Sequence, residues 1–254
     1  MIQKKKYFSL LIFFSGAILF ELHAQESVVP LQSNPVIKRE LLKIKEGNIS
    51  ALKAADAIGD TLSLPFIDDF SYTGIYPDQA RWTDSAVFIN NDFPVNPPTL
   101  GVATFDGINK YGGQYNPSLT SYGVADTLTS KPIDLNYPND TTIWLSFFYQ
   151  PQGLGTNMQI RDSIYLEFFG SDSAWHFAWS KKGSPTTLPF AQAMINIRDA
   201  IYLFNGFRFR FLNKAALYAM HDQWNLDYVR LDTGRSAADT VIVNDVAFVK
   251  RGLS

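Results

Sequence analysis

The chain has 254 residues, of which 46% are hydrophobic and 18% charged, so it is long and apolar enough to bury a large core. Its 22 Lys and Arg residues against 24 Asp and Glu residues give a net charge of -2, which removes the electrostatic argument for binding nucleic acid or an anionic membrane. The absence of cysteine excludes disulfides and thiolate metal sites. Aromatic residues make up 15% of the chain, which favours a β-rich fold.

Residues 1–24 have the parts of a secretory signal peptide. Three lysines at positions 4–6 precede an apolar run over 7–20, and the small residue Ala24 precedes a polar start at Gln25. The apolar run is shorter than the ~20 residues that a membrane-spanning helix needs. We therefore expect export to the cell surface, the medium or the periplasm, with cleavage after Ala24 and no membrane span in the mature chain.

Residues 25–60 read as a linker that is partly helical. Pro30 and Pro35 interrupt it, and residues 36–57 are charged with helix-compatible spacing that breaks at Gly47. From residue 61 onward, short alternating apolar runs are separated by Pro, Gly, Asn and Asp, which indicates one domain over 61–254. The chain stops directly after the last expected strand, as a fragment of a longer protein would.

The alternating segments predict an all-β fold, a jelly-roll antiparallel β-sandwich of the concanavalin A-like or galactose-binding-like kind. The expected strands are 86–90, 101–106, 124–130, 141–149, 163–170, 175–181, 201–212, 224–231 and 240–250. Residues 191–200 are the one helical candidate in the second half of the chain.

Two of these strands carry strong burial signals. Phe207, Phe209 and Phe211 share one face while Arg208 and Arg210 share the other, which predicts a core face and a face toward water or a carboxylate. Residues 143–149 are apolar on both faces apart from one serine, which predicts a fully buried central strand.

Two acidic clusters stand near the ends of the expected domain. Asp68 and Asp69 lie at its start, and Asp222 and Asp227 lie near its end. If the first and last strands pair, these four carboxylates converge, and a hard cation such as Ca²⁺ offsets their repulsion. The alternative is that the four side chains face water or cap turns.

The same segments resemble the ends of MAM domains and of the cleaved-adhesin domains of Bacteroidetes surface proteins. The resemblance rests on the early Asp-Asp-Phe at 68–70 and the late Asp-Gln-Trp-Asn-Leu-Asp-Tyr-Val at 222–229, with Trp82 similar to an early tryptophan of those modules. Tyr228 stands where that closing motif has a second acidic residue. The resemblance implies a jelly-roll module that shares calcium between its two ends, in proteins associated with type IX secretion.

A long loop over 106–124 carries Tyr111, Tyr115 and Tyr122 among glycines and amides. Exposed rings beside Asn and Gln suit the apolar face and the hydroxyls of a sugar, so the three tyrosines are candidates for a ligand platform. The alternative is that they fold back onto the edge of the sandwich.

Motifs for catalysis are weak. The chain has three histidines and neither a Gly-x-Ser-x-Gly elbow nor a His-Glu-x-x-His helix. A glycosidase needs only two carboxylates, for which Asp106, Glu167, Asp222 and Asp227 are candidates. We expect a non-catalytic surface module for adhesion or glycan recognition, whose partner is a glycan or a surface protein. The rivals are a component of a type IX secretion or gliding assembly and a polysaccharide-degrading enzyme.

Overall fold

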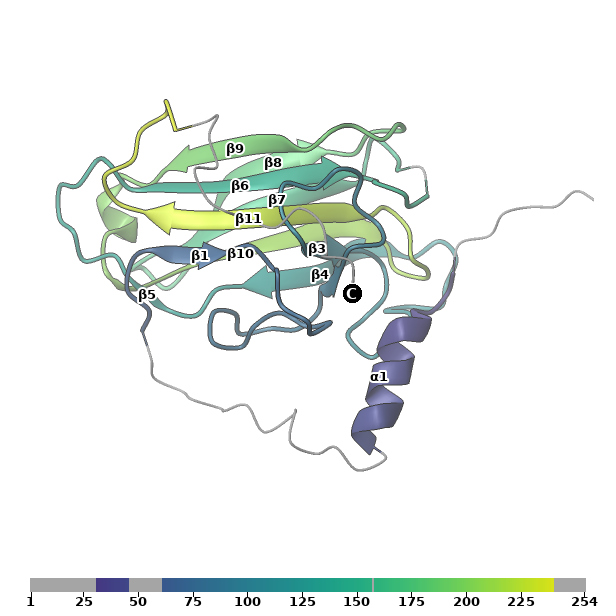
Figure 1. The fold of residues 1–254 in the computed structure, drawn as a ribbon. Coiled ribbons are helices and arrows are strands. Elements are labelled where there is room, and N and C mark those ends of the chain that lie inside the picture. The colour runs from purple at the N-terminus through teal and green to yellow at the C-terminus, as the bar shows by residue number, and fades with distance from the viewer. Residues whose placement is uncertain (1–30, 46–60, 157, 240–254) are drawn as a thin grey trace, which may run out of the picture.

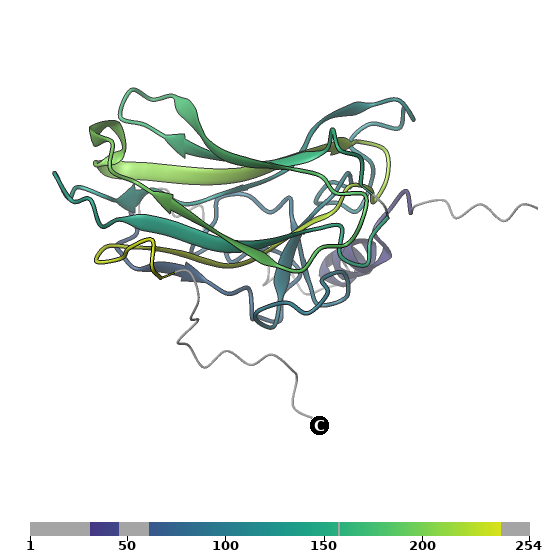
Figure 2. The same ribbon diagram turned by 90° about the horizontal axis from the view of Figure 1, so that it is seen from above.

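Two antiparallel sheets face each other (Figures 1 and 2) in the computed structural model, which describes residues 31–45, 61–156 and 158–239. The larger sheet has the order β2-β3-β11-β6-β9, and β1 pairs with β11 beyond the end of β3. Its strands are β1 (Phe66–Asp68), β2 (Phe88–Asn90), β3 (Val102–Phe105), β6 (Trp144–Pro151), β9 (Ala191–Asn196) and β11 (Trp224–Asp232). The smaller sheet has the order β4-β10-β7-β8, with β5 paired to β10. Its strands are β4 (Tyr122–Thr129), β5 (Ile133–Asp134), β7 (Ser163–Phe169), β8 (Trp175–Lys182) and β10 (Asn205–Ala216).

The chain crosses repeatedly between the two sheets, because β6, β9 and β11 join the larger sheet while β7, β8 and β10 join the smaller one. This arrangement confirms the antiparallel jelly-roll sandwich that the strand pattern predicts. The predicted central strand corresponds to β6, which lies between β11 and β9.

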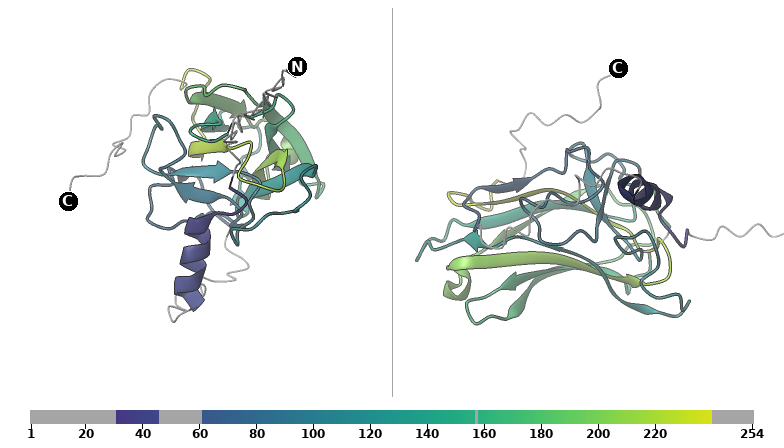
Figure 3. Two further views of the ribbon diagram at one scale, coloured as in Figure 1. Left: turned by 90° about the vertical axis from the view of Figure 1, so that its right-hand side faces the viewer. Right: turned by 90° about the horizontal axis from the view of Figure 1, so that it is seen from below.

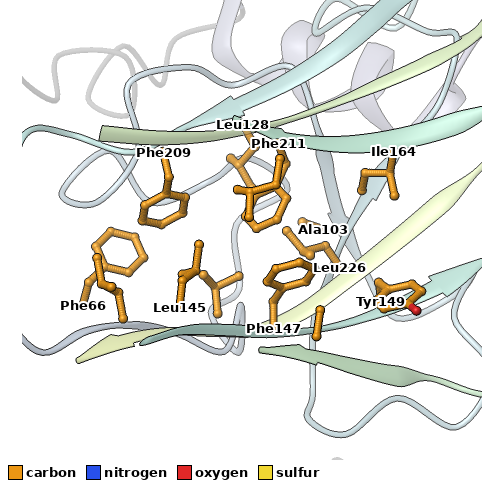
Figure 4. Close-up of a cluster of buried hydrophobic side chains, with 14 of the residues drawn as sticks. Phe66, Ala103, Leu128, Leu145, Phe147, Tyr149, Ile164, Phe209, Phe211 and Leu226 are labelled. Carbon is orange, nitrogen blue, oxygen red and sulfur yellow. The ribbon is translucent and has the colours of Figure 1, made fainter. Parts of the chain in front are cut away.

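Aromatic side chains from both sheets fill the space between them (Figure 4). Phe209 and Phe211 point from β10 toward Leu145 and Phe147 of β6, and the Phe147 and Phe211 rings meet edge to face with centroids 4.8 Å apart. The predicted alternation of β10 is confirmed, since its three phenylalanines are fully buried. Each such ring stabilises the fold by about 1.5–3 kcal/mol through burial.

Trp82 closes one end of this core. Its ring meets Phe66 and Phe209 edge to face and stacks on Phe70, and the indole Nε1 donates to Asp68 Oδ2 at 2.6 Å. The hydrogen bond satisfies the one polar atom of a fully buried ring.

Three strand expectations need correction or addition. The helix expected over 191–200 is wrong: residues 191–196 form β9, and a short 3-10 helix begins only at Ala200. The edge of β6 offers a ladder of partners, and this pairing outweighs the helix propensity of Ala191, Gln192 and Met194. The short strands β1 and β5 are not predicted by the pattern. The strand expected over 240–250 lies outside the described residues.

One helix, α1 (Pro35–Lys45), lies in the predicted linker beside one end of the sandwich (Figure 3). Asn34 caps it, since its Oδ1 accepts from the backbone N–H groups of Val36 at 3.0 Å and Ile37 at 3.2 Å, while Pro35 supplies the fixed φ of a first helical residue. The backbone N–H of Asn34 also donates to Gly112 O at 3.1 Å, so the helix start is attached to the 106–124 loop.

The predicted signal peptide at 1–24 lies outside the described residues. Within the ranges that the structure does describe, no helix is long and apolar enough to cross a membrane.

Candidate ligand-binding face

Aromatic rings and cationic side chains alternate on the outer surface of the smaller sheet. β7 buries Ile164, Leu166 and Phe168, so its alternate side chains face outward, and β10 repeats this pattern with its phenylalanines. Register places Phe169 opposite Trp175 and Glu167 opposite Phe177, and cross-strand partners share a face. We call this surface the aromatic face, and its aromatic and charged members are Tyr122, Tyr165, Glu167, Phe169, Trp175, Phe177, Lys182, Arg208, Arg210 and Lys214.

A bulge in β8 sets which rings reach the aromatic face. Glu167 pairs with Phe177 while the preceding Leu166 pairs with Trp179, so one extra residue, Ala178, stands between them. Phe177 therefore turns outward with 65% of its surface exposed, and Trp179 turns inward to pack on Phe147. Without the bulge the two rings would share one face.

Two guanidinium groups lie over rings of the aromatic face. The guanidinium carbon of Arg208 is 4.1 Å from the Phe169 ring centre and 5.7 Å from that of Trp175, and the same atom of Arg210 is 4.2 Å from the Trp175 ring centre. Arg210 also forms an ion pair with Glu167, whose Oε2 accepts from Arg210 Nε at 2.6 Å. The carboxylate partner expected for the polar face of β10 is therefore present for Arg210.

Further cations stand at the opposite end of the aromatic face. Lys214 Nζ lies 5.1 Å from the Tyr165 ring centre, and Lys214 and Lys182 are both paired with Ser163 from its two sides. Arg208, Lys182 and Lys214 have no carboxylate within ion-pair distance in the described part of the chain.

The three tyrosines proposed from the loop have different surroundings. Tyr111 is 63% exposed, beside Lys110. Tyr115 donates its hydroxyl proton to Asp126 Oδ1 at 2.7 Å, and burial together with that charge holds the pKa of Tyr115 far above its usual range. Tyr122 belongs to the aromatic face, with its hydroxyl donating to Arg161 O at 2.7 Å and the Arg161 guanidinium carbon 4.5 Å from its ring centre. A ligand-binding role for Tyr111, Tyr115 and Tyr122 stays a prediction.

The early acidic cluster is used within the fold. Asp68 accepts from the Trp82 indole and, through Oδ1, from Phe70 N at 2.9 Å; burial raises its pKa to about 6, although the bond from Trp82 acts in the opposite direction. Asp69 accepts from the backbone and hydroxyl of Ser71 at 3.1 and 2.7 Å. These contacts match the turn-capping alternative.

The late acidic residues occupy two separate places. Asp227 accepts from Thr99 twice, at Oδ2 from the backbone N–H (2.9 Å) and at Oδ1 from the hydroxyl (2.7 Å), and burial raises its pKa to about 7. The same hydroxyl lies 2.8 Å from the Asp69 carbonyl oxygen. Asp222 accepts from Ala216 N at 2.8 Å and faces the carboxyl group of Asp162, whose pKa is raised by burial and then by Asp222.

The structure thus links Asp69 to Asp227 and places Asp222 beside Asp162. Among the described residues, no three His, Asp or Glu side chains are arranged to hold a metal ion. The calcium site of Asp68, Asp69, Asp222 and Asp227 stays a prediction.

The carboxylates named as catalytic candidates are occupied by structural contacts. Asp106 is buried and accepts from Ile108 N at 2.6 Å, while its own N–H donates to Asp126 Oδ2 at 2.8 Å. Burial raises the pKa of both Asp106 and Asp126, and the charge of Asp106 raises that of Asp126 further. Glu167 is paired with Arg210. The absence of catalytic activity stays a prediction, and the structural contacts of Asp106 and Glu167 favour it.

The sequence analysis predicts the strands of the aromatic face but not that their outward rings form one surface. Tyr165 and Phe169 on one strand and Trp175 and Phe177 on the next all occupy alternate positions, which is a signal that the sequence contains. The bulge at Ala178 has no comparable signal, and without it Trp179 would be assigned to the same face as Phe177.

No protein-family model and no curated protein sequence matches the chain. Solved structures that are similar include the CBM22-1 xylan-binding domain of Paenibacillus barcinonensis Xyn10C (6% identity, 70% of this chain and 100% of that one, TM-score 0.39). A second is Caldicellulosiruptor saccharolyticus CBM27-1 in complex with mannohexaose (12% identity, 72% of this chain and 91% of that one, TM-score 0.34). A third is CsCBM6-3 of Clostridium stercorarium in complex with cellobiose (11% identity, 70% of this chain and 100% of that one, TM-score 0.30). All three TM-scores lie below 0.5.

Proposed function

We propose that the chain is an exported, non-catalytic module that binds a glycan on the aromatic face. The observation that carries the proposal is the Phe177 ring, which the bulge in β8 turns outward with 65% of its surface exposed, opposite the hydrogen-bonding side chain of Glu167. Support for export comes from the sequence of residues 1–24.

The chemistry of the aromatic face suits a sugar better than a second apolar surface. Its rings meet in two pairs, Phe169 with Trp175 and Tyr165 with Phe177. Arg208, Arg210 and Glu167 lie on the same face, so charged side chains interrupt the apolar surface that a protein partner would bury. A sugar ring stacks its C–H face on an aromatic ring and needs donors and acceptors for its hydroxyl groups. The Arg210–Glu167 pair fixes one donor group and one acceptor group beside Phe177.

The test is binding of the purified protein to soluble glycans by calorimetry, with neutral chains (xylohexaose, cellohexaose, mannohexaose) and acidic chains in one panel. Phe177→Ala is expected to weaken binding about tenfold or more, because a stacked ring is removed. Its fold should be unchanged, since the side chain is exposed.

Tyr111→Ala is the matched control, because it removes a ring of equal exposure outside the aromatic face. Loss of binding in Tyr111→Ala with full binding in Phe177→Ala would move the site to the 106–124 loop. If the folded protein binds none of the glycans, the proposal is overturned, and the alternative of a structural surface component is favoured.

A further inference from the structure

The charges on the aromatic face point to a particular class of glycan, an inference that rests on the proposed function. The whole chain carries a net charge of -2, whereas the aromatic face carries four cations against the single carboxylate of Glu167. That carboxylate is already paired with Arg210. Asp84 lies at the β4 edge of the same sheet, where it accepts from Thr127 and Thr129. Among the described residues it forms no ion pair with Arg208, Lys182 or Lys214. The face thus concentrates positive charge on an otherwise slightly acidic protein.

The unpaired cations follow the rings along the face rather than gathering in one spot. Arg208 lies over Phe169 near one end, and Lys214 and Lys182 lie at the Tyr165 end, on the two strands that flank β7. A chain that stacked on Phe177 and ran along this face would therefore meet a positive charge on either side of the ring. Such spacing fits a polymer that repeats its own negative charge.

The fixed geometry of Arg208 favours a carboxylate as that charge. A guanidinium over an aromatic ring is held there by a cation–π interaction, and it carries a planar fork of N–H donors. Those donors match the two oxygens of a carboxylate, and the short distance of 4.1 Å to Phe169 restricts their movement. In a neutral glycan, Arg208 would have no counter-charge to meet.

We propose that the aromatic face binds an acidic polysaccharide, a chain of uronic acid sugars whose rings stack on Phe177 and whose carboxylates pair with Arg208 and Lys214. The recognition combines the stacking of the proposed function with charge-assisted hydrogen bonds that a neutral sugar cannot make.

The experiment compares polygalacturonate with its fully methyl-esterified form, which has the same backbone without the charge. We expect the purified protein to bind the acid form and to bind the ester about tenfold or more weakly, the fold-change of losing one hydrogen bond to a charged group. Added salt should weaken binding to the acid form. Arg208→Gln should lower affinity for the acid form about tenfold, toward that for the ester, and leave affinity for the ester unchanged, while Lys214 keeps its share of the preference.

Lys110→Gln is the control, since it removes the same charge from an exposed position beside Tyr111. Equal binding of acid and ester, or an Arg208→Gln variant that binds the acid form as the unaltered protein does, would overturn the acidic-glycan proposal while leaving glycan binding intact. Binding of neither form, nor of any neutral glycan, would overturn both. Equal binding of single-stranded DNA would show a general attraction for polyanions and would also overturn the proposal.

Discussion

Asp227 shows how a buried carboxyl group is held in this fold. It is fully buried, yet both of its oxygens accept from Thr99, and the Thr99 hydroxyl also lies near the Asp69 carbonyl oxygen. An ionised carboxylate in this place loses its hydration, which is why its pKa rises to about 7. Two explanations for this residue, a calcium ligand and a partner of Thr99, predict different responses to the same substitution.

Asp227→Asn should keep or slightly raise the melting temperature at pH 8, with calcium and with a chelator alike. The amide oxygen can accept from Thr99 N, and the amide nitrogen can donate to the Thr99 hydroxyl, which then donates to Asp69 O. Asp227→Ala removes both contacts and should cost about 1–3 kcal/mol in either condition. Thermal unfolding of both variants measures this, and a loss for Asp227→Asn that appears only with calcium would establish the cation instead.

Among the strands, the sequence predicts best where side chains alternate without interruption. The phenylalanines of β10 and the apolar β6 are assigned correctly because each residue's burial follows from its own position in the pattern. β9 was misassigned because a strand at an edge depends on its neighbour β6 rather than on its own residues. The same limit applies to the aromatic face, where Trp179 and Phe177 are sorted by a bulge.

Helix α1 depends on a single capping residue. Asn34→Ala should destabilise it by about 1 kcal/mol, since two backbone N–H groups lose their acceptor. Faster amide exchange across residues 36–45 is the expected readout, with Ser33→Ala, one residue earlier, as the control. The backbone N–H of residue 34 still donates to Gly112 O in this variant, so the response should be confined to the helix, and unchanged exchange there would show that the cap does not support it.

At the scale of the whole molecule, buried acids set the response to pH. Burial raises the pKa of Asp68 to about 6 and that of Asp227 to about 7, and it also raises those of Asp106, Asp126 and Asp162. Each group binds its proton more tightly folded than unfolded. The resulting stability is fully present below the unfolded pKa of ~3.9 and is lost as pH rises through the folded pKa.

The protein should therefore be more stable at pH 5 than at pH 8, by a few kcal/mol, roughly the sum expected from several such groups. Urea unfolding at the two pH values measures the difference. Asp106→Asn should reduce it, because the amide cannot ionise next to Asp126. Greater stability at pH 8 would contradict this account of the buried carboxyl groups.

The position of β1 against β11 has a mechanical consequence. The two strands are antiparallel, with Phe66 opposite Leu231 and Asp68 opposite Val229, so the start of one lies beside the end of the other. A force that pulls residue 66 away from residue 231 acts across the β1–β11 ladder, so it breaks the residue pairs one after another instead of loading all of them at once in shear. This seam lies in the larger sheet, whereas the aromatic face lies on the smaller one. Under such a pull, the seam would part while the strands that carry the aromatic face were still paired with one another.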